Sequence, residues 1–425
     1  MATTSTKHIV MFPFPGQGHH VSFLEAAQHL LRILPGDVSI TLVSTPRNGV
    51  ALRASTSASS SPLVLSFHAL PFVPADHGLP ADCESTNSLP PTAYPTFFEA
   101  FEALEPAFDA YISRLVAENG PVCVISDVFV AWTVGVAHRR GCTHAVFVSC
   151  GALGTAILHA LWKNMPALPF ADDGLLRLPE HPEVELHRSQ MAQVFLSSPS
   201  HAVDRPIAFH HRQIKHAYLT DAVLVNTVQE LESTGLAMLR RTLGEQVPVC
   251  PIGPLPPASV LYISFGSQNS LRPKQMMELA TALESTERLF IWAFRPPVGL
   301  DPDGGEEWLP AGFGRVRGAA SWTVDGRRSL THGVPIVGWP LSAEQFYNVK
   351  MLAEEWGVCV EVARGNLETS AVESCKVAEG IETVMGPEMR RRVADVQGLM
   401  KSAWAEDGGS SRAALKEFFA AMRLH

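Results

Sequence analysis

Two histidines stand in a short glycine-containing segment near the start of the chain, residues 16–20 (GQGHH). The segment follows an apolar run, residues 8–14, and precedes a helical pattern, so both histidines are expected at the amino end of a helix. Because that end of a helix disfavours an imidazolium, a histidine there is expected to be neutral and able to accept a proton. A histidine in such a loop is more often structural, so the segment alone leaves a structural role and a general base both open.

Asp127 is the second candidate for chemistry. It follows a buried strand pattern, residues 122–126 (VCVIS), where a carboxylate is costly unless hydrogen bonds or water stabilise it. A helix N-cap would satisfy the side chain as well as a functional contact would, so both interpretations are compatible with its position.

Glu344 and Gln345 follow another apolar run, residues 334–337 (VPIV), and begin a helix predicted over residues 344–356. Side chains at the carboxyl end of a buried strand lie where open α/β sheets bind ligands. A carboxylate beside an amide offers acceptors and donors together, which suits a polyol such as a sugar, although a capped surface helix explains the segment too. Ser267 ends the turn of residues 264–267 (SFGS), which suits a diphosphate or an ordinary strand-to-helix turn.

The elements that position these residues alternate between strand and helix patterns, which predicts a doubly wound parallel sheet. Strand patterns cover residues 8–14, 38–44, 63–70, 122–126, 143–148 and 224–228, and helical patterns cover residues 22–33, 97–118 and 230–243. Ser22 and Glu25 form a capping-box pattern that would begin the first helix. Residues 71–95 and 170–200 are expected to be loops, and residues 247–257 have the Pro/Gly composition of a linker.

After the linker the alternation resumes, with strands predicted near residues 260–264, 289–295, 334–337 and 358–362. Helices are predicted over residues 273–283, 370–385, 387–404 and 410–424.

Composition excludes several classes of protein. A chain of 425 residues is long enough for two domains, and a net charge of −9 without a basic block argues against a nucleic-acid partner. No run of 18 apolar residues or secretory signal is recognisable, so a cytoplasmic protein without a membrane span is expected. The seven scattered cysteines indicate reduced thiols, and neither they nor His210, His211 and His216 form a ligand set for a metal.

Residues 333–348 (GVPIVGWPLSAEQFYN) resemble the end of the signature box of the plant UDP-sugar-dependent glycosyltransferases. The resemblance implies a GT-B-like fold, in which two Rossmann-like, doubly wound parallel-sheet domains face a cleft. It implies that Glu344 and Gln345 hold hydroxyls of the sugar and that Gly18 and Ser267 belong to the donor site. It also implies that His19 is the general base and that Asp127 orients it.

The family resemblance gives domain bounds: residues 1–248 would bind the acceptor, 249–257 would link, 258–408 would bind the UDP-sugar, and 409–425 would form a helix that returns to the first domain. The expected reaction transfers glucose, or a similar sugar, to a hydroxyl of a small plant phenol such as a flavonoid, with inversion. The UDP-sugar is a co-substrate, no cofactor or metal is required, and a monomer is expected.

The front of the signature box departs from the family. The family has a Trp-x-x-Pro-Gln segment that stacks on uracil, a His-Cys-Gly-Trp-Asn-Ser run for the diphosphate and a glutamate for the ribose. Residues 314–335 read GRVRGAASWTVDGRRSLTHGVP, and Arg328 stands where the ribose glutamate would align. A second deletion is expected between the linker and the strand that follows it.

These deletions keep an alternative open: a catalytically impaired relative, or a faulty gene model, that binds a small apolar ligand without transferring sugar. A nicotinamide-dependent oxidoreductase is disfavoured. Val21 stands at the third glycine of a dinucleotide fingerprint, and Ser44 and Thr45 stand where its ribose-binding acid would be.

Overall fold

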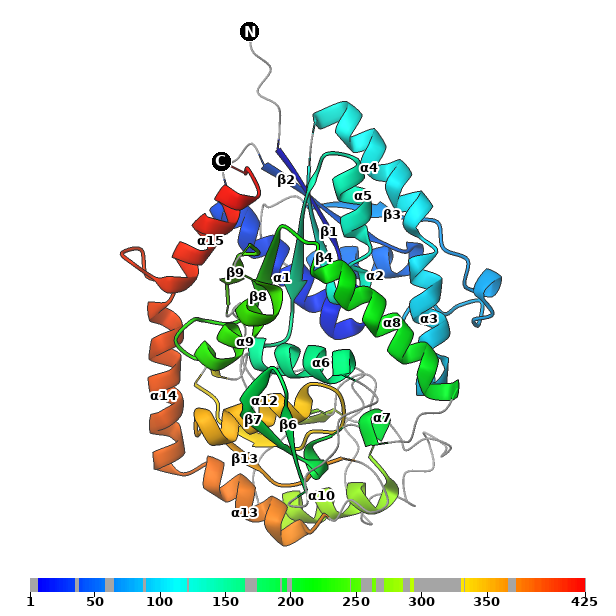
Figure 1. Ribbon diagram of the computed structural model, residues 1–425. Helices are drawn as coiled ribbons and strands as arrows, with labels where there is room; N and C mark the ends of the chain where they lie inside the picture. Colours follow the sequence, from blue (N-terminus) through cyan, green and yellow to red (C-terminus); the bar gives the residue numbers. More distant parts are fainter. Residues whose placement is uncertain are drawn as a thin grey trace.

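The structure is a computed structural model that describes residues 7–34, 38–57, 65–86, 89–120, 122–164, 174–191, 193–196, 201–244, 246–253, 262–264, 271–285, 291–293, 330–331, 333–365 and 372–424. Figure 1 shows two stacked halves, one built on a large sheet and the other on shorter strands and helices.

The large sheet has seven strands in the order β3-β2-β1-β4-β5-β8-β9, and each neighbouring pair is parallel. They are β1 (Lys7–Phe12), β2 (Val38–Ser44), β3 (Ser66–Ala69), β4 (Cys123–Asp127), β5 (Thr143–Val148), β8 (Ala222–Val225) and β9 (Val249–Pro251). Parallel strands are covered on both faces, which explains their nearly continuous apolar sequences. The predicted doubly wound parallel sheet is therefore confirmed, and β2 and β5 have the predicted bounds.

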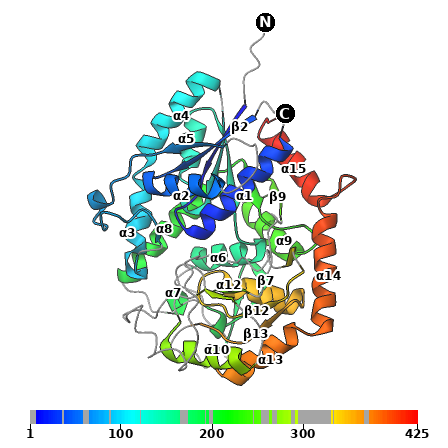
Figure 2. The ribbon, with the colours of Figure 1, turned by 180° about the vertical axis from the view of Figure 1, so that it is seen from behind.

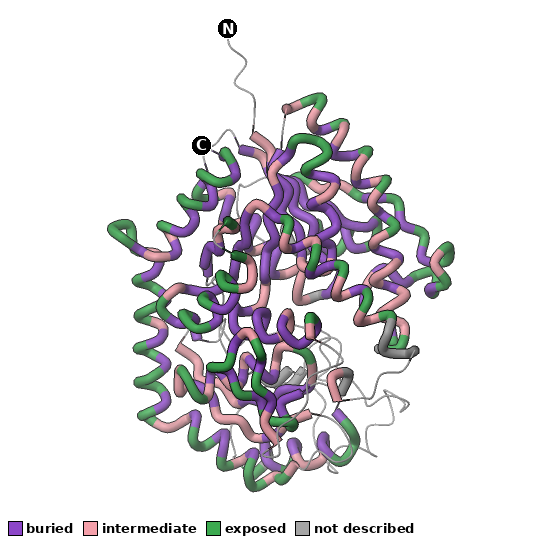
Figure 3. The backbone as a smooth tube through the Cα atoms, viewed as in Figure 1, coloured by how far each residue is buried: buried purple, intermediate pink, exposed green. Residues whose placement is uncertain are grey.

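Helices cover both faces of this sheet. They are α1 (Gln17–Ile33), α2 (Pro46–Ser57), α3 (Tyr94–Glu102), α4 (Glu105–Asn119), α5 (Thr133–Arg139), α6 (Ala152–Asn164), α7 (Gln193–Leu196), α8 (His201–Ala217) and α9 (Ser233–Leu243). On one face α1 packs through Phe23 against Ile125 and Phe147, and on the other Phe108 and Val136 pack against Val124. Figure 2 shows α1 and α2 in front of the sheet, whereas α4 and α5 lie in front of it in Figure 1. Figure 3 shows the strands between these layers as buried chain.

The first helix begins five residues earlier than its capping-box pattern predicts. Gly16 is the N-cap of α1, in extended conformation and without a side-chain cap, so Ser22 and Glu25 lie inside the helix. His19 and His20 consequently belong to the first turn of α1 rather than to a loop before it.

Three further predictions are wrong in detail. The helix predicted over residues 97–118 is divided into α3 and α4, because Pro106 in the first turn of α4 cannot continue a helix from residue 102. The loop predicted over residues 170–200 contains an antiparallel hairpin, β6 (Leu175–Leu178) and β7 (His181–His187). The predicted linker begins with strand β9, because Val249 and Cys250 are buried at the edge of the sheet.

The described part of the second half contains two parallel strand pairs. They are β10 (Tyr262–Ser264) with β11 (Ile291–Ala293), and β12 (Ile336–Gly338) with β13 (Cys359–Glu361). Its helices are α10 (Pro273–Ser285), α12 (Gln345–Lys350), a π-helical turn (Met351–Glu355), α13 (Ser374–Val384) and α14 (Pro387–Ser402). One hydrophobic cluster joins the halves, since Leu153 of α6 and Leu236 of α9 belong with Phe346 of α12 and Val393 of α14.

The end of the chain returns to the first half. After α14, helix α15 (Ser410–Ala421) packs through Leu415 and Phe418 into the cluster beneath the large sheet. The carbonyl of Gly253, two residues after β9, accepts hydrogen bonds from Trp404 Nε1 at 2.8 Å and Ser411 Oγ at 2.9 Å. An added Cβ at Gly253 would lie 2.5 Å from the Thr227 nitrogen, so only glycine fits this crossing.

Among the described residues, no helix is long and apolar enough to cross a membrane. All seven cysteines are free thiols, and six of them are buried or partly buried.

Candidate functional site

His19 and Asp127 are 108 residues apart in the sequence and form a direct hydrogen bond. His19 Nδ1 lies 2.7 Å from Asp127 Oδ2. A carboxylate only accepts, so Nδ1 carries the proton and Nε2 of a neutral ring is left with a lone pair. The His19 side chain is 25% exposed and that of Asp127 is 1% exposed, so the histidine separates the carboxylate from solvent.

The charge of the site favours protonation of His19. Burial lowers the pKa of His19, but the charge and hydrogen bond of Asp127, together with the charge of Glu344, raise this pKa above its ordinary value overall. The sequence expectation that a histidine at the amino end of α1 has a neutral ring therefore does not hold in direction for His19, whose pKa is raised. The pKa of the neighbouring His20 is lowered to about 4 by burial and by His19, so His20 is neutral.

The position of Asp127 follows from the end of β4. It is the last residue of the strand and the N-cap of a single 3-10 turn (Val128–Val130), where its Oδ1 accepts from the Phe129 amide at 3.0 Å. Its other oxygen, Oδ2, is then available to His19. The N-cap interpretation of Asp127 is therefore confirmed for Oδ1, and the orienting role of Asp127 stays a prediction with which the contact from Oδ2 to His19 is compatible.

Aromatic rings pack against His19. The rings of Phe14 and Phe129 lie edge-on to the imidazole, with centroids 5.5 and 5.6 Å away. Phe98 stacks on Phe129 at 5.6 Å and on Phe209 at 4.8 Å. A group that approaches His19 therefore meets flat apolar surfaces, which favour an aromatic partner.

His210 adds one polar atom to these rings. Its ring stacks on Trp162 at 3.8 Å and lies 5.9 Å from Phe129. Its Nδ1 is 2.7 Å from the Pro206 carbonyl, which only accepts, so Nδ1 carries the proton. Burial lowers the pKa of His210 to about 4, so Nε2 is an acceptor at neutral pH.

Glu344 and Gln345 lie where the second half meets α6. Glu344 is the N-cap of α12, directly after Ala343, whose φ of 53° is unusual for a residue with a side chain. Gln345 Oε1 accepts from the Leu341 and Ser342 amides at 2.9 and 3.3 Å, which fixes the turn before the helix. An added Cβ at Gly154 of α6 would lie 3.2 Å from the Glu344 Cβ, so the two helices touch here.

The other predicted site residues have different outcomes. Gly18 lies beside His19 in the first turn of α1. Ser267 lies outside the described residues, as does Arg328 at the altered front of the signature box. The sequence reasoning missed the aromatic residues and His210, because they come from five separate segments whose apolar patterns resemble ordinary core.

The chain is similar to known glycosyltransferases in sequence and in fold. Residues 257–392 match the family described as UDP-glucoronosyl and UDP-glucosyl transferase. UDP-glycosyltransferase 92A1 of Arabidopsis thaliana is 33% identical over 477 residues, covering 96% of each chain. Flavonol 3-O-glucosyltransferase UGT89B1 of the same plant is 27% identical, covering 84% of each. Among solved structures, Phytolacca americana UGT2 complexed with UDP-2fluoro-glucose and pterostilbene has a TM-score of 0.78 at 23% identity, covering 98% of this chain and all of that one.

The chain belongs to the plant UDP-glycosyltransferase family and has its two-domain GT-B fold, as predicted. It is accordingly a transferase that acts between a UDP-sugar and a small-molecule acceptor. The alignment with UDP-glycosyltransferase 92A1 extends over 477 positions, more than the 425 residues of this chain, so that relative contains segments that are absent here.

Proposed function

We propose that the protein transfers glucose, or a similar hexose, from a UDP-sugar to a hydroxyl of a small plant phenol such as a flavonoid, with inversion at the anomeric carbon. The observation that carries the proposal is the 2.7 Å contact between His19 Nδ1 and Asp127 Oδ2. It leaves Nε2 as a base beside a set of aromatic rings. The flavonol and pterostilbene in the names of two similar proteins are consistent with a phenolic acceptor.

In the proposed mechanism, His19 Nε2 takes the proton of the acceptor hydroxyl, and Asp127 stabilises the imidazolium that results. The acceptor oxygen forms a bond to the anomeric carbon as the bond from that carbon to the diphosphate breaks. UDP leaves with the electron pair of the broken bond. One displacement accounts for inversion, and no covalent enzyme intermediate is needed.

The remaining residues bind substrates in this proposal. Phe98 and Phe129 stack against the acceptor, and His210 Nε2 accepts a hydrogen bond from a second hydroxyl on it. Glu344 and the amide nitrogen of Gln345 bind hydroxyls of the sugar, while Gly18 and Ser267 contact the donor. The protein is proposed to act as a cytoplasmic monomer.

The test of the base is His19→Ala. Transfer from UDP-glucose to a flavonol should be lost, whereas calorimetric titration with UDP should give the same affinity as the parent. Since general-base catalysis typically contributes 10²- to 10⁴-fold, a variant that transfers at the parental rate would refute the assignment.

A second candidate function is supported by the absent front of the signature box: a relative that binds an apolar ligand but does not transfer sugar. Several lost contacts, each worth about 1 kcal/mol or more, would weaken donor binding by orders of magnitude. The UDP titration of the parent separates the two. Measurable binding supports the transferase, and a folded protein that does not bind UDP supports the second function.

A further inference from the structure

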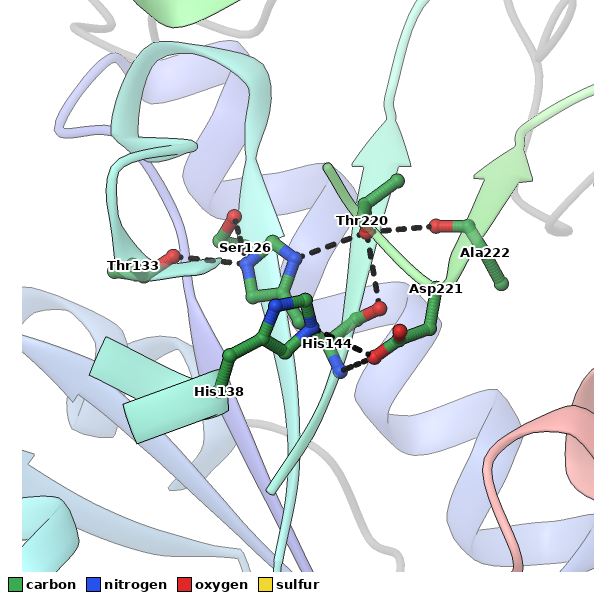
Figure 4. A network of polar contacts seen from close by, with 7 residues as sticks. All are labelled: Ser126, Thr133, His138, His144, Thr220, Asp221 and Ala222. Carbon is green, nitrogen blue, oxygen red and sulfur yellow. Dashed lines mark hydrogen bonds and ion pairs between the residues drawn. The ribbon is translucent and has the colours of Figure 1, made fainter. Parts of the chain in front are cut away.

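A polar network lies inside the apolar core of the large sheet, around His144 of β5. The His144 side chain is fully buried, and its Nε2 lies 3.1 Å from Ser126 Oγ and 3.0 Å from Thr133 Oγ1. Its Nδ1 lies 2.9 Å from Thr220 Oγ1. Figure 4 shows the ring between these three hydroxyls, which come from β4, α5 and the segment before β8. Buried polar groups of this kind are costly unless every one has a partner.

Two of the three hydroxyls bracket Asp127. Ser126 precedes it in β4, and Thr133, the first residue of α5, lies three residues after the turn that Asp127 caps and donates to the carbonyl of its last residue, Val130, at 2.9 Å. Side chains alternate along a strand, so Ser126 and Asp127 point to opposite faces of the sheet. His144 therefore holds both ends of the Asp127 turn from the face opposite to His19.

The network is a rigid support rather than a proton acceptor. Burial, with the charges of His138 and His216, lowers the pKa of His144 to about 3, so the ring is neutral throughout the working range. The backbone fixes the ring position as well: the His144 amide donates to Asp221 Oδ2 at 2.8 Å, and the His144 carbonyl accepts from the Asp221 amide at 2.9 Å. The outer contact between His138 and Asp221, at 3.1 Å, is exposed and contributes little to this support.

We propose that His144 is a positioning residue for glycosyl transfer: through Ser126 and Thr133 it fixes the turn that presents the Asp127 carboxylate to His19. The proposal rests on the function proposed above for His19 and Asp127. A displacement of about 1 Å at a catalytic group can cost about 10²-fold in rate. Contacts that fix the position of the Asp127 carboxylate therefore affect the rate of transfer.

The variant that removes this support is His144→Phe. The phenyl ring fills most of the space of the imidazole but offers no nitrogen to the hydroxyls. Each hydroxyl keeps a backbone acceptor, since Ser126 Oγ lies 3.3 Å from the Asp127 carbonyl and Thr133 Oγ1 lies 2.9 Å from the Val130 carbonyl. Thr220 Oγ1 likewise keeps the His144 carbonyl at 2.9 Å, so the variant is expected to fold.

The control is Thr220→Val, which removes the contact to Nδ1, together with the Thr220 hydrogen bonds to the His144 and Ala222 carbonyls, and leaves both contacts that bracket Asp127. A second test variant, Ser126→Ala combined with Thr133→Val, removes those two contacts and keeps His144. If His144→Phe does not fold, this double variant decides the question.

The first readout is the titration of the His19 ring by NMR, with its signal identified as the one that His19→Ala lacks. It needs no acceptor. In His144→Phe and in the double variant the pKa of His19 should fall, because a loosened Asp127 no longer offsets burial. In Thr220→Val it should equal that of the parent. The second readout is transfer from UDP-glucose to a flavonol, in which kcat should fall about tenfold to a hundredfold with little change in the KM for UDP-glucose.

A folded His144→Phe protein in which His19 titrates as in the parent, with an unchanged pH profile of kcat, would overturn the proposal. So would an equal fall in the pKa of His19 in Thr220→Val. If His19→Ala retains transfer, the proposed function fails, and the titration of His19 still decides whether His144 positions Asp127.

Discussion

Replacement of Asp127 by asparagine tests the proposed catalytic pair most sharply, because the two carboxylate oxygens have different partners. Oδ1 accepts from the Phe129 amide and Oδ2 accepts from His19 Nδ1. An asparagine has only one oxygen. If that oxygen serves Phe129, the amide nitrogen faces His19 and requires Nδ1 to accept, which places the proton on Nε2 and blocks the base.

The opposite orientation is also costly. It keeps the productive tautomer of His19, with the proton on Nδ1, but directs the asparagine nitrogen at the part-buried Phe129 amide, a clash of two donors. A buried donor without a partner costs about 1–3 kcal/mol, which corresponds to roughly 5- to 150-fold in the population of the productive form. The lost carboxylate charge adds a further factor, since charged hydrogen bonds are about twice as strong as neutral ones. We expect kcat to fall by about 10²- to 10⁴-fold.

The matched variant is Asp127→Ala, in which Nδ1 of His19 has lost the carboxylate. The neutral ring can then adopt either tautomer, with the proton on Nδ1 or on Nε2. Initial rates of transfer from UDP-glucose to a flavonol, with UDP titration and thermal unfolding as controls, should rank the parent first, Asp127→Ala second and Asp127→Asn last. A more active Asp127→Asn than Asp127→Ala, in folded proteins with equal UDP affinity, would refute the reasoning.

Three other predictions follow from the same contacts and the packing around them. Because the pKa of His19 is raised in the folded state, the His19–Asp127 pair stabilises the fold fully below the unfolded pKa of about 6.5, and this stabilisation is lost as pH rises through the folded pKa. Urea unfolding should therefore show a larger deficit for His19→Gln at about pH 5.5 than at about pH 8.5; equal deficits would contradict it. Gly154→Ala should raise the KM for UDP-glucose several-fold, because its Cβ would lie 2.9 Å from Asn348 Oδ1 and 3.2 Å from the Glu344 Cβ. Gly49→Ala, where an added Cβ meets nothing within 4 Å, is its control, and the same KM in both variants would count against a role for Glu344. Phe418→Ala should lower the free energy of unfolding by about 3–5 kcal/mol, since the ring is fully buried beneath the sheet, whereas exposed Lys416→Ala should change it little. A loss below about 1 kcal/mol in urea unfolding of Phe418→Ala would mean that α15 does not contribute to the core.

Much of the fold was accessible from the sequence because parallel strands bury both faces. β2 and β5 are continuous apolar runs, and their bounds follow from that pattern. The start of α1 was not accessible in the same way. Ser22 and Glu25 satisfy a capping pattern, but the helix extends back to Gly16, which caps without a side chain. Local rules gave a possible helix start, and packing selected another.

Part of the candidate site could be predicted from the sequence and part could not. The pairing of His19 with Asp127 was expected from a family resemblance, and each residue alone had an ordinary structural explanation. The support from His144 could not be predicted, because a histidine within the apolar run of β5 has no periodic signal. Its partners Ser126, Thr133 and Thr220 become neighbours only when β4, β5 and β8 are aligned side by side.

The carbonyl of Gly253 holds the C-terminal segment against the first half. Among the described residues, the end of the segment that follows β9 and the segment from α14 to α15 are fastened to each other at one atom, the carbonyl oxygen of Gly253. Because both contacts converge on one acceptor atom, any displacement of the Gly253 carbonyl would release the Trp404 and Ser411 contacts together and free the C-terminal segment from the end of β9.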